Sequence, residues 1–96
     1  MVYVDNAFVQ RHGRLWCHLL ADSLEELHEF AASVGLSVYA FHRAARIPHY
    51  DVTHRQRLLM LKMGAKPVTV RQGVALTRHL ASGCRGTKPR QQELFA

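Results

Sequence analysis

The feature that most constrains this chain is a set of three short apolar or aromatic runs, each closed by an aspartate. The runs are residues 2–5, 16–22 and 48–51. They end in Asp5, Asp22 and Asp51, which are the only aspartates in the sequence. Runs of this length and composition are typical of strands. The chain is therefore expected to build a sheet, with a carboxylate at the end of each of these runs.

Helix signals separate the runs. Ser23 with Glu26 three residues later has the spacing of a capping box, and Gly35 is a suitable stop for that first helix. A second helix is expected to begin after Asp51 or Thr53, and a third to span residues 71–82. Further strands are expected at residues 36–41 and 68–70. This alternation predicts a small α/β domain with a mostly parallel sheet of four to five strands and about three helices.

Ninety-six residues suffice for one small domain, which we place at residues 1–82. Residues 83–96 are rich in glycine and basic side chains, and we expect a flexible tail there. No stretch has the length and apolarity of a membrane span, and the N-terminus lacks the pattern of a signal peptide. We therefore expect a cytoplasmic protein with no membrane partner. Cys17 lies in an apolar run and is expected in the core, and the absence of a Cys-x-x-Cys pair argues against a thiolate zinc site.

The net charge of +6 is distributed unevenly along the chain. Residues 1–42 carry two basic and five acidic side chains, whereas residues 43–96 carry eleven basic and two acidic ones. A basic block of this kind favours a polyanionic partner, and we expect nucleic acid or a nucleotide. An acidic protein surface is another possible partner, and a solvated basic surface without a partner is the alternative.

The aspartates are accompanied by histidines. Side chains alternate across a strand, so His18 shares a face with Asp22, and His49 shares a face with Asp51. Ligands of open α/β sheets bind outside the carboxyl ends of the strands, where all three aspartates are expected to lie. Carboxylates with a few imidazoles suit a divalent metal, for which we expect Mg²⁺ or Mn²⁺. The predicted metal ligands are Asp5, Asp22 and Asp51, with His18 and His49 as ligands or proton carriers.

Each of these residues has a structural alternative. Asp22 and Asp51 both precede helices and can serve as N-caps. His28 lies on an apolar helix stripe, where a hydrogen-bonded core histidine is the simpler interpretation. The remaining histidines, which we interpret as surface residues, are His12, His42, His54 and His79. Arg55 and Arg57 fall in the first turn of the second predicted helix, where they can contact phosphate or belong to a solvated face.

The chain ends in an apolar pair on a polar segment. Gln91, Leu94 and Phe95 are spaced as in the short peptides with which bacterial proteins dock on the replication sliding clamp. The basic residues before them would add reach and affinity for nearby DNA. The alternative is that Leu94 and Phe95 fold back onto the domain.

Several motifs together resemble one family of short bacterial and phage proteins, domain of unknown function 4031. The motifs are Val-Tyr-Val-Asp (2–5), Gly-Arg (13–14), Trp-Cys-His-Leu (16–19), Ala-Asp-Ser-Leu-Glu-Glu-Leu-His-Glu-Phe-Ala (21–31), Pro-His-Tyr-Asp (48–51) and Gly-Ala (64–65). The resemblance covers residues 2–70 and implies a small stand-alone protein, but no established activity. The positions it implies as part of the family pattern are Asp5, His18, Asp22, His28, His49, Tyr50 and Asp51. The chain departs from the pattern at Tyr-Ala-Phe-His (39–42), where Trp-Phe-Gln is expected.

Two classes of function follow from these observations. The first is metal-dependent phosphodiester or phosphoryl chemistry on nucleic acid or a nucleotide, like that of a nuclease. The second is a non-enzymatic module that binds nucleic acid or protein, such as a phage inhibitor or a replication accessory. A protein that sequesters a small phosphorylated ligand is a third possibility.

Overall fold

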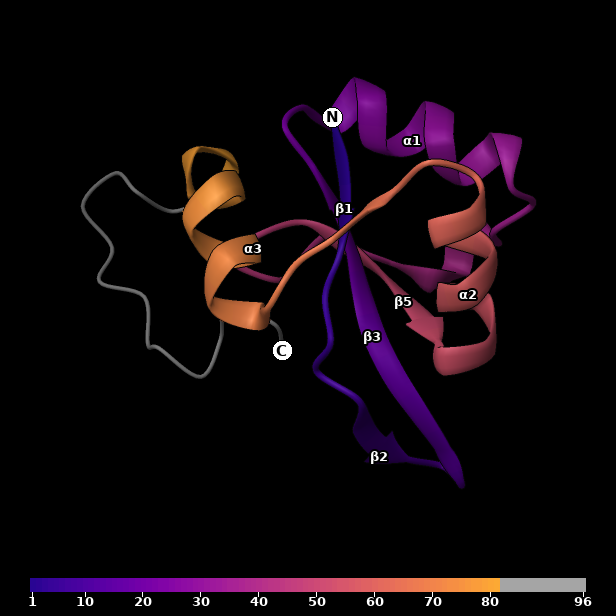
Figure 1. Ribbon diagram of the computed structural model, residues 1–96. Coiled ribbons are helices and arrows are strands. Elements are labelled where there is room, and N and C mark those ends of the chain that lie inside the picture. The colour runs from indigo at the N-terminus through magenta and orange to yellow at the C-terminus, as the bar shows by residue number, and fades with distance from the viewer. Residues whose placement is uncertain (82–96) are drawn as a thin grey trace.

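The computed structural model describes residues 1–81, which form a twisted sheet with helices on both faces (Figure 1). The strands are β1 (Val2–Val4), β2 (Val9–Arg11), β3 (Arg14–Ala21), β4 (Phe41–His42), β5 (His49–Thr53) and β6 (Lys66–Pro67). The α-helices are α1 (Leu24–Ser33), α2 (His54–Lys62) and α3 (Val70–Thr77). Two 3₁₀ turns, Val38–Ala40 and Arg78–Leu80, complete this part of the chain. The predicted α/β class and helix number are confirmed for the described residues.

The sheet is mostly antiparallel, so the predicted parallel sheet is wrong. Its strand order is β4-β5-β3-β1-β6, and β2 forms a hairpin with β3. Among the strands of residues 1–81, only β1 and β6 pair in parallel. The reason lies after α1: the helix returns the chain to β4 at the sheet edge, and a reversal through residues 43–48 then sends β5 back between β4 and β3.

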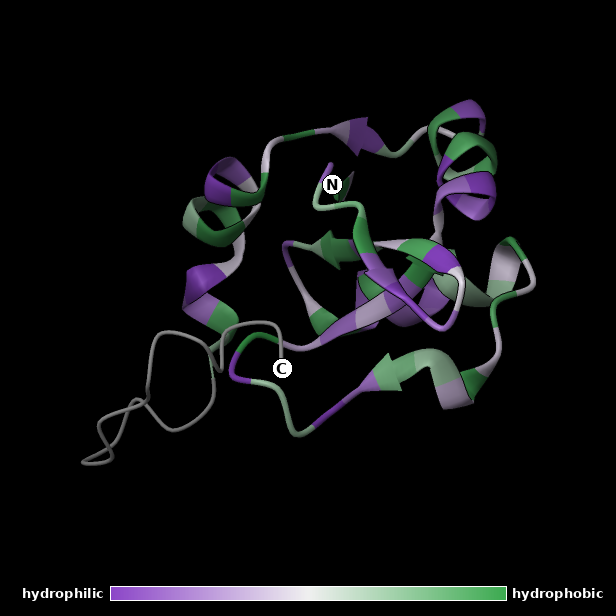
Figure 2. Cartoon of the chain, turned by 90° about the horizontal axis from the view of Figure 1, so that it is seen from below, coloured by the Kyte–Doolittle hydropathy of each residue, from purple (hydrophilic) through white to green (hydrophobic). Residues whose placement is uncertain are grey.

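The sheet separates two clusters of buried side chains. Alternation along β3 directs Cys17 and Leu19 toward α1 and α2, and it directs Leu20 toward the opposite face, where α3 packs. Figure 1 shows α2 and α3 on opposite sides of the sheet. In Figure 2, hydrophobic and hydrophilic segments alternate along the helices, as expected for helices that bury one face. Cys17 is fully buried, which confirms its predicted place in the core.

Helix starts follow the predicted capping chemistry. The Ser23 hydroxyl accepts a hydrogen bond from the Glu26 backbone, and Thr53 forms a full capping box with Gln56. Asp22 and Asp51 are therefore not the caps of α1 and α2.

Two predicted strands are absent at the expected places. Thr69, expected in a strand at residues 68–70, is the N-cap of α3, and the strand lies earlier at Lys66–Pro67. In the strand expected at residues 36–41, Val38–Ala40 form a 3₁₀ turn capped by Ser37, and only Phe41 belongs to a strand, the two-residue β4. In both segments a hydroxyl that can cap a turn overrides the β propensity of the flanking residues.

Two predictions concern the C-terminal part. The third helix, expected at residues 71–82, ends at Thr77 and continues as a 3₁₀ turn to Leu80. The predicted tail at 83–96, with its docking residues Gln91, Leu94 and Phe95, lies outside the described residues. Within residues 1–81 no helix is long and apolar enough to cross a membrane.

We predict that Gly73→Ala destabilises the domain. A Cβ at Gly73 would lie 2.8 Å from Leu20 Cδ1, and Leu20 is fully buried. Overpacking costs about 1–3 kcal/mol, which exceeds the roughly 1 kcal/mol that alanine gains over glycine in a helix. Urea denaturation should show that Gly73→Ala lowers the free energy of unfolding when Leu20 is present. The same substitution should cause no such loss in a Leu20→Val background. An equal loss in both backgrounds would contradict this packing account.

Candidate metal centre

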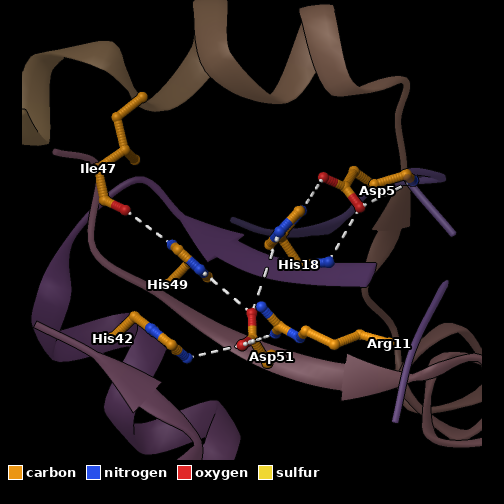
Figure 3. Close-up of polar contacts among 8 residues, drawn as sticks. Asp5, Arg11, His18, His42, Ile47, His49 and Asp51 are labelled. Atoms are coloured by element: carbon orange, nitrogen blue, oxygen red, sulfur yellow. Dashed lines mark hydrogen bonds and ion pairs between the residues drawn. The ribbon is translucent and has the colours of Figure 1, made fainter. Parts of the chain in front are cut away.

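His18, His49 and Asp51 meet on the face of the sheet that α3 also covers. His18 on β3 is the register partner of Asp51 on β5, and His49 lies two residues before Asp51 on the same face. One ligand atom from each of the three side chains lies within 4.8 Å of the others. All three residues are buried. Figure 3 shows both imidazole rings directed toward the Asp51 carboxylate.

Asp5 holds His18 in place. Its Oδ2 lies 2.7 Å from His18 Nδ1, and its Oδ1 accepts hydrogen bonds from the backbone N–H groups of His18 at 2.9 Å and Ala7 at 3.2 Å. Asp5 is fully buried, and both of its oxygens are engaged in these contacts. The carboxylate accepts, so Nδ1 of His18 carries the proton and Nε2 faces Asp51. Asp5 is thus a positioning residue for His18, in the manner of carboxylates that orient metal-bound histidines.

His49 is oriented by the backbone. Its Nδ1 donates to the carbonyl oxygen of Ile47 at 2.9 Å, and its side chain is fully buried. The ring stands edge-on to His18, with centroids 4.8 Å apart, and stacks on His42 at 5.1 Å. Since Nδ1 is the donor, Nε2 is the atom that faces the Asp51 carboxylate, at 3.2 Å from Oδ1.

The two oxygens of Asp51 have different surroundings. Oδ1 faces His49 Nε2 at 3.2 Å and His18 Nε2 at 4.0 Å. Oδ2 is held by His42 Nε2 at 2.6 Å and by Arg11 Nη2 at 3.1 Å (Figure 3). Oδ1 is therefore the oxygen that completes the three-atom cluster, while His42 and Arg11 fix the plane of the carboxylate.

Asp51 remains ionised at neutral pH. Burial acts to raise its pKa, but a hydrogen bond from His49 Nε2, which the ring can donate only when it is protonated, and the positive potential of protonated His49, His42 and His18 outweigh burial. The pKa of Asp51 consequently lies below its ordinary value of 3.8. A buried anion facing two imidazole Nε2 atoms can be balanced in two ways, by protonation of the rings or by a shared metal cation.

Asp22 does not join this cluster, so the expectation that Asp5, Asp22 and Asp51 meet at one rim is wrong. β1 and β3 are antiparallel, so the end of β3 lies beside the start of β1, while Asp5 follows the other end of β1. Asp22 accepts a hydrogen bond from the Tyr3 hydroxyl at 2.9 Å and pairs with the N-terminal ammonium at 3.2 Å. The expectation that three aspartates share one rim depended on a parallel sheet.

Sequence reasoning missed two members of the site. His42 was assigned to the surface, yet its Nε2 binds Asp51, because β4 pairs with β5 and places His42 opposite His49. Arg11 reaches Asp51 from the β2–β3 hairpin. The signal for this hairpin was Gly13, which has a positive φ of 73° in the turn between Arg11 and Arg14.

The remaining residues singled out in the sequence, Arg55, Arg57 and His28, are not part of the three-residue cluster. Arg57 donates from Nε to the Asp5 carbonyl at 2.8 Å and lies over the ring of Phe8. Arg55 is exposed beside the β2–β3 hairpin. His28 Nδ1 lies 2.7 Å from the Tyr50 hydroxyl, on the sheet face that packs against α1, so the predicted hydrogen bond exists although His28 itself is exposed.

We predict a modest, pH-dependent contribution of Asp22 to stability. Partial burial acts to raise the pKa of Asp22, but hydrogen bonds from Tyr3 and the N-terminal ammonium outweigh burial and hold it below 3.8. A carboxyl with a lowered folded-state pKa stabilises above its unfolded-state pKa, and this contribution is lost as pH falls through the folded-state value. Asp22→Asn keeps an acceptor for Tyr3 and removes the charge.

The free energy of unfolding of Asp22→Asn should fall short of wild type by less than about 1 kcal/mol at pH 7, because Asp22 is well exposed. The difference should shrink as the pH falls below 3.8. Urea denaturation at a series of pH values measures it, with the exposed Glu29→Gln as the matched charge control. A difference that grows on acidification would contradict the assignment.

Comparison with known proteins gives a family but no characterised relative. No curated protein and no solved structure matches the chain. The family model described as "Protein of unknown function (DUF4031)" matches residues 2–80, a span that contains β1 through α3 and every residue of the cluster. The chain therefore belongs to the DUF4031 family.

Proposed function

We propose that this protein is a metal-dependent enzyme that acts on phosphodiester or phosphoryl groups of nucleic acid or a nucleotide. The observation that carries the proposal is the cluster of His18 Nε2, His49 Nε2 and an Asp51 oxygen, whose atoms lie within 4.8 Å of one another. Each imidazole is oriented through Nδ1 by a separate acceptor, Asp5 for His18 and the Ile47 carbonyl for His49. Such outer contacts are typical of histidines that bind metals.

The ligand set narrows the choice of metal. Two imidazoles with a single carboxylate suit Mn²⁺, Fe²⁺ or Zn²⁺ better than Mg²⁺, which prefers oxygen ligands. We therefore favour Mn²⁺ over Mg²⁺ for the resident ion. Three protein ligands are the number found in catalytic sites, which keep positions open for substrate, whereas structural zinc sites use four. A bound ion would supply a Lewis acid that polarises a phosphoryl oxygen and activates water.

Cationic side chains next to the cluster support a phosphate-bearing substrate. Arg11 contacts Oδ2 of Asp51, and its side chain is about half exposed, so its guanidinium group is accessible to a ligand. Arg57 is anchored to the backbone of Asp5. Arginine binds phosphate through paired N–H donors. Of the two arginines predicted from the sequence, Arg57 contacts the backbone of Asp5, the residue that positions His18, and Arg55 lies beside the hairpin that carries Arg11.

Substitutions in the cluster should separate ligands from the residue that positions them. Asp51→Asn removes a ligand charge and should abolish Mn²⁺ binding in isothermal titration calorimetry. Asp5→Asn leaves the ligands in place but loosens His18, so we expect a loss in affinity of about 10–100-fold. Asp22→Asn, which lies at the other end of β3, should bind Mn²⁺ like the wild type. Unchanged binding by Asp51→Asn, with the fold verified by circular dichroism, would refute the metal centre.

Hydrolysis should require both the ion and His49. With a fluorescent single-stranded oligonucleotide, His49→Gln should reduce Mn²⁺-dependent cleavage on the order of 100-fold or more. EDTA should remove the activity, and added Mn²⁺ should restore it. If the protein binds DNA in a salt-dependent way, but neither EDTA nor His49→Gln affects any activity, the non-enzymatic binding module is the correct alternative.

A further inference from the structure

Trp16 lies two residues before His18 on β3, so both side chains lie on the face of the sheet that contains the candidate metal centre. Trp16 is the only tryptophan of the chain, and it is partly exposed. We propose that the indole ring of Trp16 stacks on the unpaired base of a nucleotide whose phosphate lies at the metal centre. The place of the phosphate rests on the function proposed above, whereas stacking on Trp16 does not require the metal.

The β2–β3 hairpin holds the indole ring in place. The indole Nε1 donates a hydrogen bond to the backbone carbonyl of Arg11 at 2.8 Å. Because the polar atom of the indole is bonded within the protein, the side chain offers its apolar ring surface to a ligand. The cross-strand neighbours of Trp16 are Val9 on β2 and Thr53 on β5, which are both smaller than the indole. Within residues 1–81, the ring contacts on this face are between histidines, and none includes the indole.

The spacing between the indole and the cluster suits one nucleotide. Trp16 precedes His18 by two residues on β3, and Thr53, its register partner on β5, follows Asp51 by two residues. Two residues of a strand span about 7 Å. This length is comparable with the separation between a base and the phosphate of the same nucleotide. A base stacked on the indole would therefore have its own phosphate within reach of the cluster.

Arg11 connects the indole with the cluster. Its carbonyl oxygen accepts the hydrogen bond from Trp16, and its Nη2 lies 3.1 Å from Oδ2 of Asp51, as Figure 3 shows. The Arg11 side chain is about half exposed, so its guanidinium group can also donate to a phosphate. An aromatic ring beside a cationic side chain is the combination with which proteins bind single-stranded nucleic acid, since the ring stacks on the base and the cation binds the backbone.

Stacking on Trp16 requires a base with an accessible face. Inside a duplex, the neighbouring base pairs cover both faces of each base, whereas an unpaired nucleotide leaves a face open to an aromatic side chain. We therefore assign the ligand to the class of nucleoside phosphates with an unpaired base. Such a base can belong to a single strand or to a free nucleotide.

The intrinsic fluorescence of Trp16 measures stacking directly, because the chain contains no other tryptophan. In EDTA, an oligothymidylate decamer should quench the emission of wild type. A decamer of abasic sites, which has the same phosphates but no bases, should not quench it. In competition with a fluorescein-labelled oligothymidylate decamer, the abasic decamer should bind about fivefold or more weakly, the equivalent of one stacked base.

Two substitutions of Trp16 separate stacking from the hydrogen bond to the hairpin. Trp16→Phe and Trp16→Leu both remove the bond to the Arg11 carbonyl, but only phenylalanine keeps an aromatic face. In fluorescence anisotropy with the labelled decamer, Trp16→Leu should lose affinity about fivefold or more, and Trp16→Phe less than about threefold. Leu15→Ala is the matched control, because Leu15 is a partly exposed apolar residue on the opposite face of β3 and should not contact the base.

Thymidine monophosphate and a duplex distinguish the sources of the base. If the monophosphate quenches Trp16 and binds as tightly as the decamer, the ligand is a free nucleotide. If the decamer binds more tightly, the ligand is a single strand. Equal quenching by a duplex would contradict the proposal, because its bases have no open face.

Three other results would overturn the proposal: no quenching of wild type by the oligothymidylate decamer, equal affinity for the abasic decamer, or equal losses in Trp16→Phe and Trp16→Leu. A failure of the metal centre gives a different pattern. In that case wild type fails to bind Mn²⁺ in calorimetry, while Trp16→Leu still loses affinity for the decamer. That pattern would retain Trp16 as a base-binding residue and reject the enzymatic function.

Discussion

The antiparallel pairing of β3 with β5 is the constraint on which the site depends. This register sets His18 opposite Asp51, so the candidate metal ligands come together through one strand pair. β5 is held in this register because Cys17 and Val52, on the other face, are fully buried against α1 and α2. A slip by one residue would exchange these faces, placing charge in the core and apolar side chains at the site.

Buried ionisable groups in so small a domain need specific partners. Asp5 is fully buried, and its two oxygens accept hydrogen bonds from a histidine ring and two backbone N–H groups, which offset the loss of hydration. The same contacts leave the Nε2 atom of His18 directed at Asp51. One hydrogen-bond network therefore stabilises the start of the hairpin segment and orients His18, a candidate metal ligand, so stability and site geometry are linked through Asp5.

Local signals were read correctly from the sequence where one or two neighbouring residues decide the outcome. Ser23 and Thr53 cap their helices because a hydroxyl bonds a backbone N–H three residues away. His49 and Asp51 share a face because strands alternate. Strand direction is different: the parallel sheet inferred from alternating elements failed because residues 43–48 reverse the chain and insert β5 beside β3. The residues of β3 and β5 alone do not indicate which strand will become the neighbour of β3, or in which direction it will run.

The sequence by itself determined the residue types available for the site, the histidines and aspartates placed on apolar runs, and the starts of α1 and α2 set by hydroxyl caps. Only the tertiary structure decided which of them meet. It separated Asp22 from Asp5 because their strands run in opposite directions, it brought His42 and Arg11 onto Asp51 from two different hairpins, and it made Asp5 a support for His18. The physical reason is that capping and alternation act over a few residues, whereas strand pairing joins segments that are dozens of residues apart.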